Sequence, residues 1–215
     1  MKKVLLLAAA AMLLAAPAMA AISGTAHDLS SGSSGTNNGA SDEICVYCHT
    51  PHGASAAVNA PLWNRTTVSS SNVYENATLD ATVTAALVDG SDAALCLSCH
   101  DGSSMTVALN NPPNAGAAVT GLANIAVGSP ALIGTDLSND HPVGFSFATA
   151  IATDTEIETK ATIEGVAGMT GALSFGGGDE MWCSSCHDVH GVTGVGQFLR
   201  IANTGSALCL TCHLK

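Results

Sequence analysis

The chain has 215 residues, including eight cysteines and eight histidines, but only 4% of its residues are aromatic. Hydrophobic residues make up 47% of the sequence, so the composition is not that of a disordered chain, and the length suits one domain or two. Acidic residues outnumber basic ones 17 to 6, which gives a formal net charge of −11 and excludes electrostatic binding of nucleic acid. Something other than aromatic side chains must fill the interior.

The first twenty residues predict a signal peptide. Lys2 and Lys3 form a positive n-region, residues 4–16 an apolar h-region, and Ala18-Met19-Ala20 an A-x-A cleavage site. The apolar run is shorter than the ~20 residues that a bilayer requires, so no membrane span is expected. Loss of the two lysines takes the formal charge from −11 to −13. The mature chain, residues 21–215, is therefore expected to be exported.

Between the motifs described below, the sequence predicts mainly connecting segments. Residues 30–41 are rich in serine, glycine and asparagine, and residues 103–140 in alanine, glycine, asparagine and proline, so both predict loops. Thr162–Glu164 and Gly171–Phe175 predict short strands, followed by a turn at Gly176–Gly178.

All eight cysteines lie in four Cys-x-x-Cys pairs, and a histidine directly follows each pair. The pairs are Cys45/Cys48, Cys96/Cys99, Cys183/Cys186 and Cys209/Cys212, and the histidines are His49, His100, His187 and His213. Disulfides, redox dithiols and zinc ribbons do not require that histidine, whereas covalent attachment of c-type haem does. The sequence therefore predicts four covalently bound haem c groups, with these histidines as the proximal ligands of the irons.

Four histidines remain as candidate distal ligands, one for each expected iron. They are His27, His52, His141 and His190. The competing axial ligand is methionine, but only three methionines follow the signal peptide. Every haem is therefore expected to have two histidine ligands and a low potential. An iron saturated in this way has no position for a substrate, which favours an electron carrier over an enzyme.

A dihaem unit occurs twice in the chain. The first and third motifs share a histidine three residues after the proximal one, His52 and His190, and the second and fourth share Leu-Cys-Leu-x-Cys-His. One further histidine, His27 or His141, precedes each unit. The units span about residues 21–102 and 135–215 of one tetrahaem domain. Because three residues reach only roughly 10–11 Å, His52 and His190 are expected to ligate a haem other than that of their own motif.

The haems are expected to replace the missing aromatic core. The predicted fold is therefore mostly irregular coil, with short helices starting near each motif and a few short strands, wrapped around four haems.

Several strings resemble secreted multihaem c-type cytochromes of metal-reducing bacteria, and among these the OmcE-type subunits of extracellular cytochrome nanowires. They are Ala26–Asp28, Cys45–His52, Pro61–Arg65, Leu137–Phe145, Cys183–His190 and Phe198–Ile201, so the resemblance covers essentially the whole mature chain. The resemblance implies subunits that stack into filaments with a continuous haem chain, little regular secondary structure, and one haem ligated by a histidine of the neighbouring subunit.

Three functions stay open at this stage. The first is the subunit of a conductive filament, outside the cell or on its surface, which exchanges electrons with other redox cytochromes and extracellular acceptors. The second is a discrete periplasmic tetrahaem shuttle, and the third is a multihaem reductase with one open haem. For the filament, His27 is expected to ligate a haem of the neighbouring subunit, because a flexible segment separates it from Cys45, and such a head-to-tail contact propagates. Ligation within its own chain is the alternative.

Overall fold

The computed structural model describes residues 22–56, 62–113, 119–174, 178–191 and 193–214. The predicted signal peptide and most of the predicted turn at Gly176–Gly178 lie outside these ranges. The helices and strands of the described residues are all short, and turns and coil connect them. In chain order they are η2 (Ile44–Tyr47), α2 (Ala85–Asp89), α3 (Ala93–His100), β1 (Phe145–Ser146), α4 (Phe147–Thr153), α5 (Lys160–Gly165), β2 (Glu180–Met181), α6 (Cys183–Cys186), η5 (Gly196–Phe198), η6 (Thr204–Ser206) and α7 (Ala207–Cys212). The predicted mostly irregular fold is confirmed.

Each Cys-x-x-Cys-His motif coincides with one of these short helices, as predicted. The first motif begins in η2, the second lies in α3, the third forms α6, and the fourth ends α7. The helical turn brings the two cysteines of a motif to the same side, because residues three apart are neighbours on a helix surface.

The two predicted strands are wrong. Residues 162–164 lie in α5, which begins after Thr159, whose hydroxyl oxygen accepts a hydrogen bond from the Thr162 amide at 3.3 Å. The described part of the second segment, residues 171–174, forms turns, and Leu173 N donates to a Glu164 carboxylate oxygen at 3.0 Å. The sheet instead pairs β1 with β2 antiparallel, in the register Phe145↔Met181.

The core consists of three small apolar clusters, each of which packs against motif cysteines. One lies in the C-terminal half, one near the first motif, and one between α3 and α6. Their buried members are, in that order, Phe145, Phe147, Ala150, Ile163, Met169, Ala172, Leu173, Met181 and Leu208; Leu29, Tyr47, Met105, Leu109 and Leu122; and Val88, Ala93, Leu97 and Leu137. This division is what a chain organised around several flat cofactors requires.

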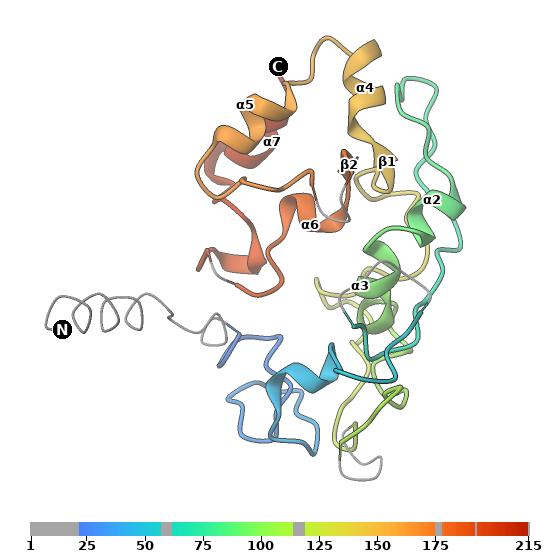
Figure 1. Ribbon diagram of the computed structural model, residues 1–215, viewed down its shortest axis with the longest axis vertical. Helices are drawn as coiled ribbons and strands as arrows, with labels where there is room; N and C mark the ends of the chain where they lie inside the picture. Colours follow the sequence, from blue (N-terminus) through green and yellow to red (C-terminus); the bar gives the residue numbers. More distant parts are fainter. Residues whose placement is uncertain (1–21, 57–61, 114–118, 175–177, 192, 215) are drawn as a thin grey trace, which may run out of the picture.

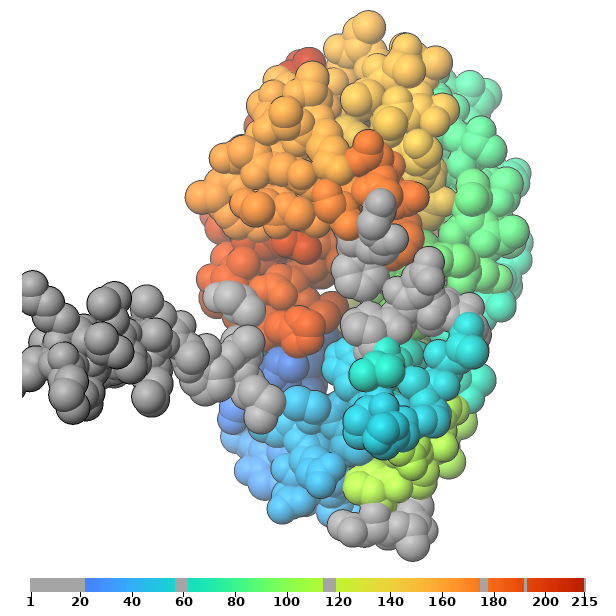
Figure 2. Space-filling model, viewed as in Figure 1, coloured from blue at the N-terminus to red at the C-terminus, as the bar shows by residue number. Residues whose placement is uncertain are grey.

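The two halves of the chain lie against each other. Figure 1 places α3 in the middle of the molecule, with α4 to α7 on one side and the N-terminal residues on the other. In the space-filling view the blue N-terminal residues contact the red-orange C-terminal ones (Figure 2). Gly144 contributes to this packing, since its φ is +79° and a Cβ there would lie 2.7 Å from Val88 Cα. No helix among the described residues is long and apolar enough to cross a membrane.

Candidate functional site

The eight motif cysteines differ in how far they are exposed. Cys45 and Cys209 are exposed, and the other six are half-buried. Burial raises the pKa of Cys48 to about 12, with Cys99 as a further cause. Burial also raises the pKa of Cys212 to about 11, with Cys186 as the next cause. The first motif therefore lies beside the second and the third beside the fourth.

Three of the four motif histidines each face one of the four remaining histidines. The ring centroids of His49 and His190 are 6.3 Å apart. Those of His100 and His27 are 6.2 Å apart, and those of His213 and His141 are 6.3 Å apart. Each pair thus joins one predicted proximal ligand to one predicted distal ligand, although the members of the pairs lie far apart in the sequence.

The spacing of the pairs fits two ligands of one metal. An imidazole nitrogen binds a metal at about 2 Å, and the ring centroid lies about 1 Å behind that nitrogen, so two axial imidazoles on one metal have centroids roughly 6 Å apart. No group of three or more His, Cys, Asp or Glu side chains within the described ranges is arranged to hold a bare ion.

In four of these histidines one ring nitrogen, Nδ1, is bonded to a backbone carbonyl oxygen. Nδ1 of His27 lies 3.0 Å from the carbonyl oxygen of Val189, and Nδ1 of His100 lies 2.6 Å from that of Ala131. His187 and His141 have the same kind of contact, to Gln197 O at 3.1 Å and Pro142 O at 2.9 Å. A carbonyl oxygen only accepts, so Nδ1 carries the proton in all four rings. Nε2 then keeps the lone pair that a metal binds, and the carbonyl orients the ring.

His27 is held within its own chain. Its ring stacks on Phe198 with centroids 4.1 Å apart, and burial lowers its pKa below the usual histidine value. The segment before the first motif therefore folds back onto the C-terminal half, where it meets His100. This arrangement favours ligation within the chain over the expected ligation of a neighbouring subunit's haem. The upstream histidine of the second unit behaves in the same way, since His141 faces His213 of its own unit.

The two histidines that follow a motif histidine by three residues, His52 and His190, differ in their surroundings. His190 faces a motif other than its own, as the reach argument requires. For His52 the structure records only backbone contacts, among them its carbonyl oxygen accepting from the Asn111 amide at 2.8 Å. His187 is the motif histidine that remains.

Two segments that the sequence analysis did not assign to the site, around Trp63 and Leu199, bond to the backbone of the first motif of each unit. Backbone bridges join His49 to Trp63 and His187 to Leu199. Both segments turn on a non-glycine residue with positive φ, Leu62 at 56° and Phe198 at 55°. Both segments lie in strings that carry the family resemblance, so the sequence contained a signal for their role. They were not assigned to the site because neither contains a metal-ligating side chain.

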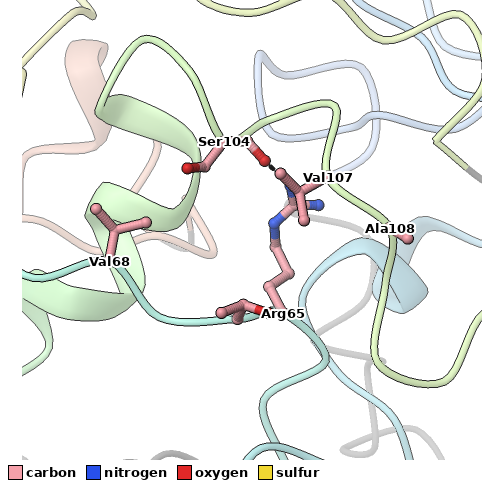
Figure 3. Close-up of a pocket in the computed structure, with 6 residues that line it drawn as sticks. Arg65, Val68, Ser104, Val107 and Ala108 are labelled. Atoms are coloured by element: carbon pink, nitrogen blue, oxygen red, sulfur yellow. Dashed lines mark hydrogen bonds between the residues drawn. The ribbon is translucent and has the colours of Figure 1, made fainter.

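Buried donors without partners lie next to the first two motifs. Arg65 is only 2% exposed, and its Nη2 donates to the carbonyl oxygens of Ser104 and Met105 at 2.8 Å each. Its Nη1 and the Trp63 Nε1 have no hydrogen-bond partner among the described residues. Figure 3 shows Arg65 reaching towards Ser104 in a cavity of about 80 Å³. Among the described residues Arg65 forms no ion pair, so its buried charge fits a cofactor that brings carboxylates of its own, as haem does.

Residues 175–215 match the family model described as a doubled CXXCH motif. The paired motif indicates a multihaem c-type cytochrome. No curated protein matches the chain. The family match spans the third and fourth motifs of the chain, so it supports covalently bound haem c and electron transfer in general. It does not address the narrower resemblance to nanowire subunits.

Proposed function

We propose that this cytochrome binds four haem c groups, each between two histidines, and conducts electrons along them. The three facing histidine pairs carry this proposal. They assign His190 to the haem of the first motif, His27 to that of the second and His141 to that of the fourth. His52 is then the ligand for the third motif, which carries His187, by elimination.

The internal repeat supports this assignment. Each upstream histidine serves the second motif of its own unit, since His27 faces His100 and His141 faces His213. His190 crosses from the second unit to the first motif of the first unit. If the two units use equivalent ligands in the same way, His52 of the first unit binds the haem of the third motif in the second unit. The two units then each supply one ligand to the other.

Haem c, when bound, supplies a one-electron iron couple. The residues of the chain set the conditions for it. The paired histidines, four of the rings oriented by backbone carbonyls, would hold each haem iron from two sides, which favours an electron carrier over a reaction on a substrate at the metal. Arg65 and Trp63 offer buried donors to the haem carboxylates, and guanidinium–carboxylate pairs are among the stronger hydrogen-bonded contacts. The motifs follow one another in space, because Cys96 of the second also contacts Cys183 of the third.

We further propose that copies of the chain stack head to tail, outside the cell after export. The support is a difference between two helices of like sequence. In α3, Leu97 is 1% exposed, and the cluster that buries it combines Val88 of its own unit with Leu137 and Cys183 of the second unit. The equivalent residue of α7, Leu210, is 49% exposed.

A second copy is the occupant that fits α7. Inside the chain, the α3 face meets the third motif through Cys183. The motif equivalent to the third is the first, and Cys45 of that motif is exposed, as is Cys209 of α7. A contact between α7 of one copy and the first motif of the next would repeat the internal junction and continue the row of haems. Such a contact is heterologous and does not close on itself.

Two experiments test the proposal. Haem content and spectra of the purified protein should give four low-spin haems per chain, and carbon monoxide should not bind the reduced native protein. Binding near one carbon monoxide per four haems, with a high-spin ferric signal, would favour the reductase.

Electron microscopy should show filaments that Leu210→Lys shortens or abolishes. Leu87→Lys is the matched control. Leu87 is 45% exposed, as Leu210 nearly is, but it lies in α2, which is part of neither α7 nor the first motif. Monomers in the unmodified protein would favour the periplasmic shuttle.

A further inference from the structure

Asp92 joins the two haem-binding units through its side chain. It directly precedes α3, which carries the second motif, and it is 5% exposed. One carboxylate oxygen accepts a hydrogen bond from the Cys183 amide at 2.9 Å, and the other accepts from the Ser184 amide at 2.8 Å. Both donors belong to α6, the third motif, about ninety residues along the chain.

The backbone of the same residue holds the second motif. Its carbonyl oxygen accepts from the amides of Leu95 at 3.0 Å and Cys96 at 3.1 Å, in the first turn of α3. Asp92 is therefore bonded to the first cysteine of both motifs, to one by its backbone and to the other by its side chain. The side chains of Cys96 and Cys183 also lie in contact with each other.

The internal repeat shows that the carboxylate is not needed to build a motif helix. In the second unit the equivalent position is Gly205, and α7 forms there without a side-chain cap. A buried carboxylate has a desolvation cost unless it is hydrogen-bonded, so an aspartate that the helix does not need has another role. What distinguishes the two helices is that α3 lies against the other unit and α7 does not.

We propose that Asp92 is a positioning residue, which holds the third motif against the second and thereby fixes the step between the haems that join the two units. The proposal rests on the proposed function, because it concerns electron transfer between the second and third haems. The side chain of Asp92 touches no predicted iron ligand, but besides the two amides it also contacts the side chain of Cys183. Its effect on the haems therefore passes through the position of α6, and of Cys183 in it, relative to α3.

The test compares Asp92→Ala and Asp92→Asn with a matched control in the haem-loaded protein. Asp89→Ala is the control, because the Asp89 carboxylate also accepts two hydrogen bonds, from Ser70 N at 2.8 Å and Ser70 Oγ at 3.0 Å, but links two segments of the first unit. All three variants should keep four low-spin haems per chain. Circular dichroism in the Soret band reports coupling between neighbouring haems, and amide exchange reports the α6 contact.

Asp92→Ala should change the Soret couplet and speed exchange of the Cys183 and Ser184 amides roughly a hundredfold, since two charge-assisted bonds are lost. Asp92→Asn, which keeps one accepting oxygen, should show a smaller change in the same direction. Asp89→Ala should leave both signals unchanged. An unchanged couplet in Asp92→Ala, or an equal change in Asp89→Ala, overturns the role of Asp92 but not the proposed function. Absence of low-spin haems from the unmodified protein overturns both.

Discussion

Replacing Leu97 by alanine is expected to destabilise the protein much more than the same replacement of Leu210. The two leucines occupy the same place in the second and fourth motifs, so their chemistry and local helix are matched. Leu97 is buried in the cluster between α3 and α6, with Val88 and Leu137 beside it, whereas about half of Leu210 is exposed. A buried Leu→Ala replacement costs about 2–5 kcal/mol, because the lost transfer free energy is joined by the cost of the cavity.

At Leu210 little is lost in a single chain, and a surface replacement typically changes the free energy of unfolding by about 0.5 kcal/mol or less. The two variants should therefore differ by at least about 2 kcal/mol. Urea unfolding of haem-loaded protein, at concentrations where it is monomeric, measures this difference, and the slopes should agree if both variants unfold as one unit. A difference below about 1 kcal/mol would mean that α3 and α7 have equivalent surroundings, which would remove the basis for the internal junction.

Three further outcomes follow from the assigned pairs and charges. His190→Ala should leave four haems attached but open the iron at His49, so that one carbon monoxide binds per reduced chain; binding at no haem would contradict the pairing. Arg65→Gln should lower one haem potential, since a buried positive charge close to a haem favours the reduced iron and its removal favours the oxidised one. Arg65→Lys should restore most of that potential in redox titrations, and equal values for both variants would argue against a role for the charge. Filaments should persist or lengthen at 1 M salt in light scattering, because the full chain has a formal charge of −11 and salt screens repulsion between copies; dispersal by salt would contradict an apolar interface.

The haem-binding motifs could be read from the sequence because covalent attachment requires a fixed local pattern. The pairing of histidines could not. His27 and His100 are separated by 73 positions (100 − 27), and coil rather than regular structure connects them. The short distance that three residues span predicted that His190 ligates the haem of another motif. Which of the other three motifs it reaches depends on how the loops fold.

The strand predicted at residues 162–164 was wrong because the strand propensity of these residues competes with a helix N-cap just before them. Threonine and isoleucine favour strands, and the segment is short. The hydroxyl of Thr159 instead accepts the Thr162 amide and begins a helix, and Ile163 is fully buried in the C-terminal cluster. The positive φ of Leu62 and Phe198 was equally invisible, since nothing in either side chain favours that conformation.

The repeat has diverged where its two copies meet different partners. The internal junction combines a buried leucine with a carboxylate that bonds two backbone amides, which makes it permanent within one chain. At α7 the leucine is retained but glycine stands in place of Asp92. A contact there would have apolar area and no charged anchor, between copies that repel each other. An interface of that kind forms when copies are concentrated and can open again, whereas one with the carboxylate would resist opening. The difference between aspartate and glycine at one repeat position thus separates a fixed junction inside the subunit from the reversible one proposed between subunits.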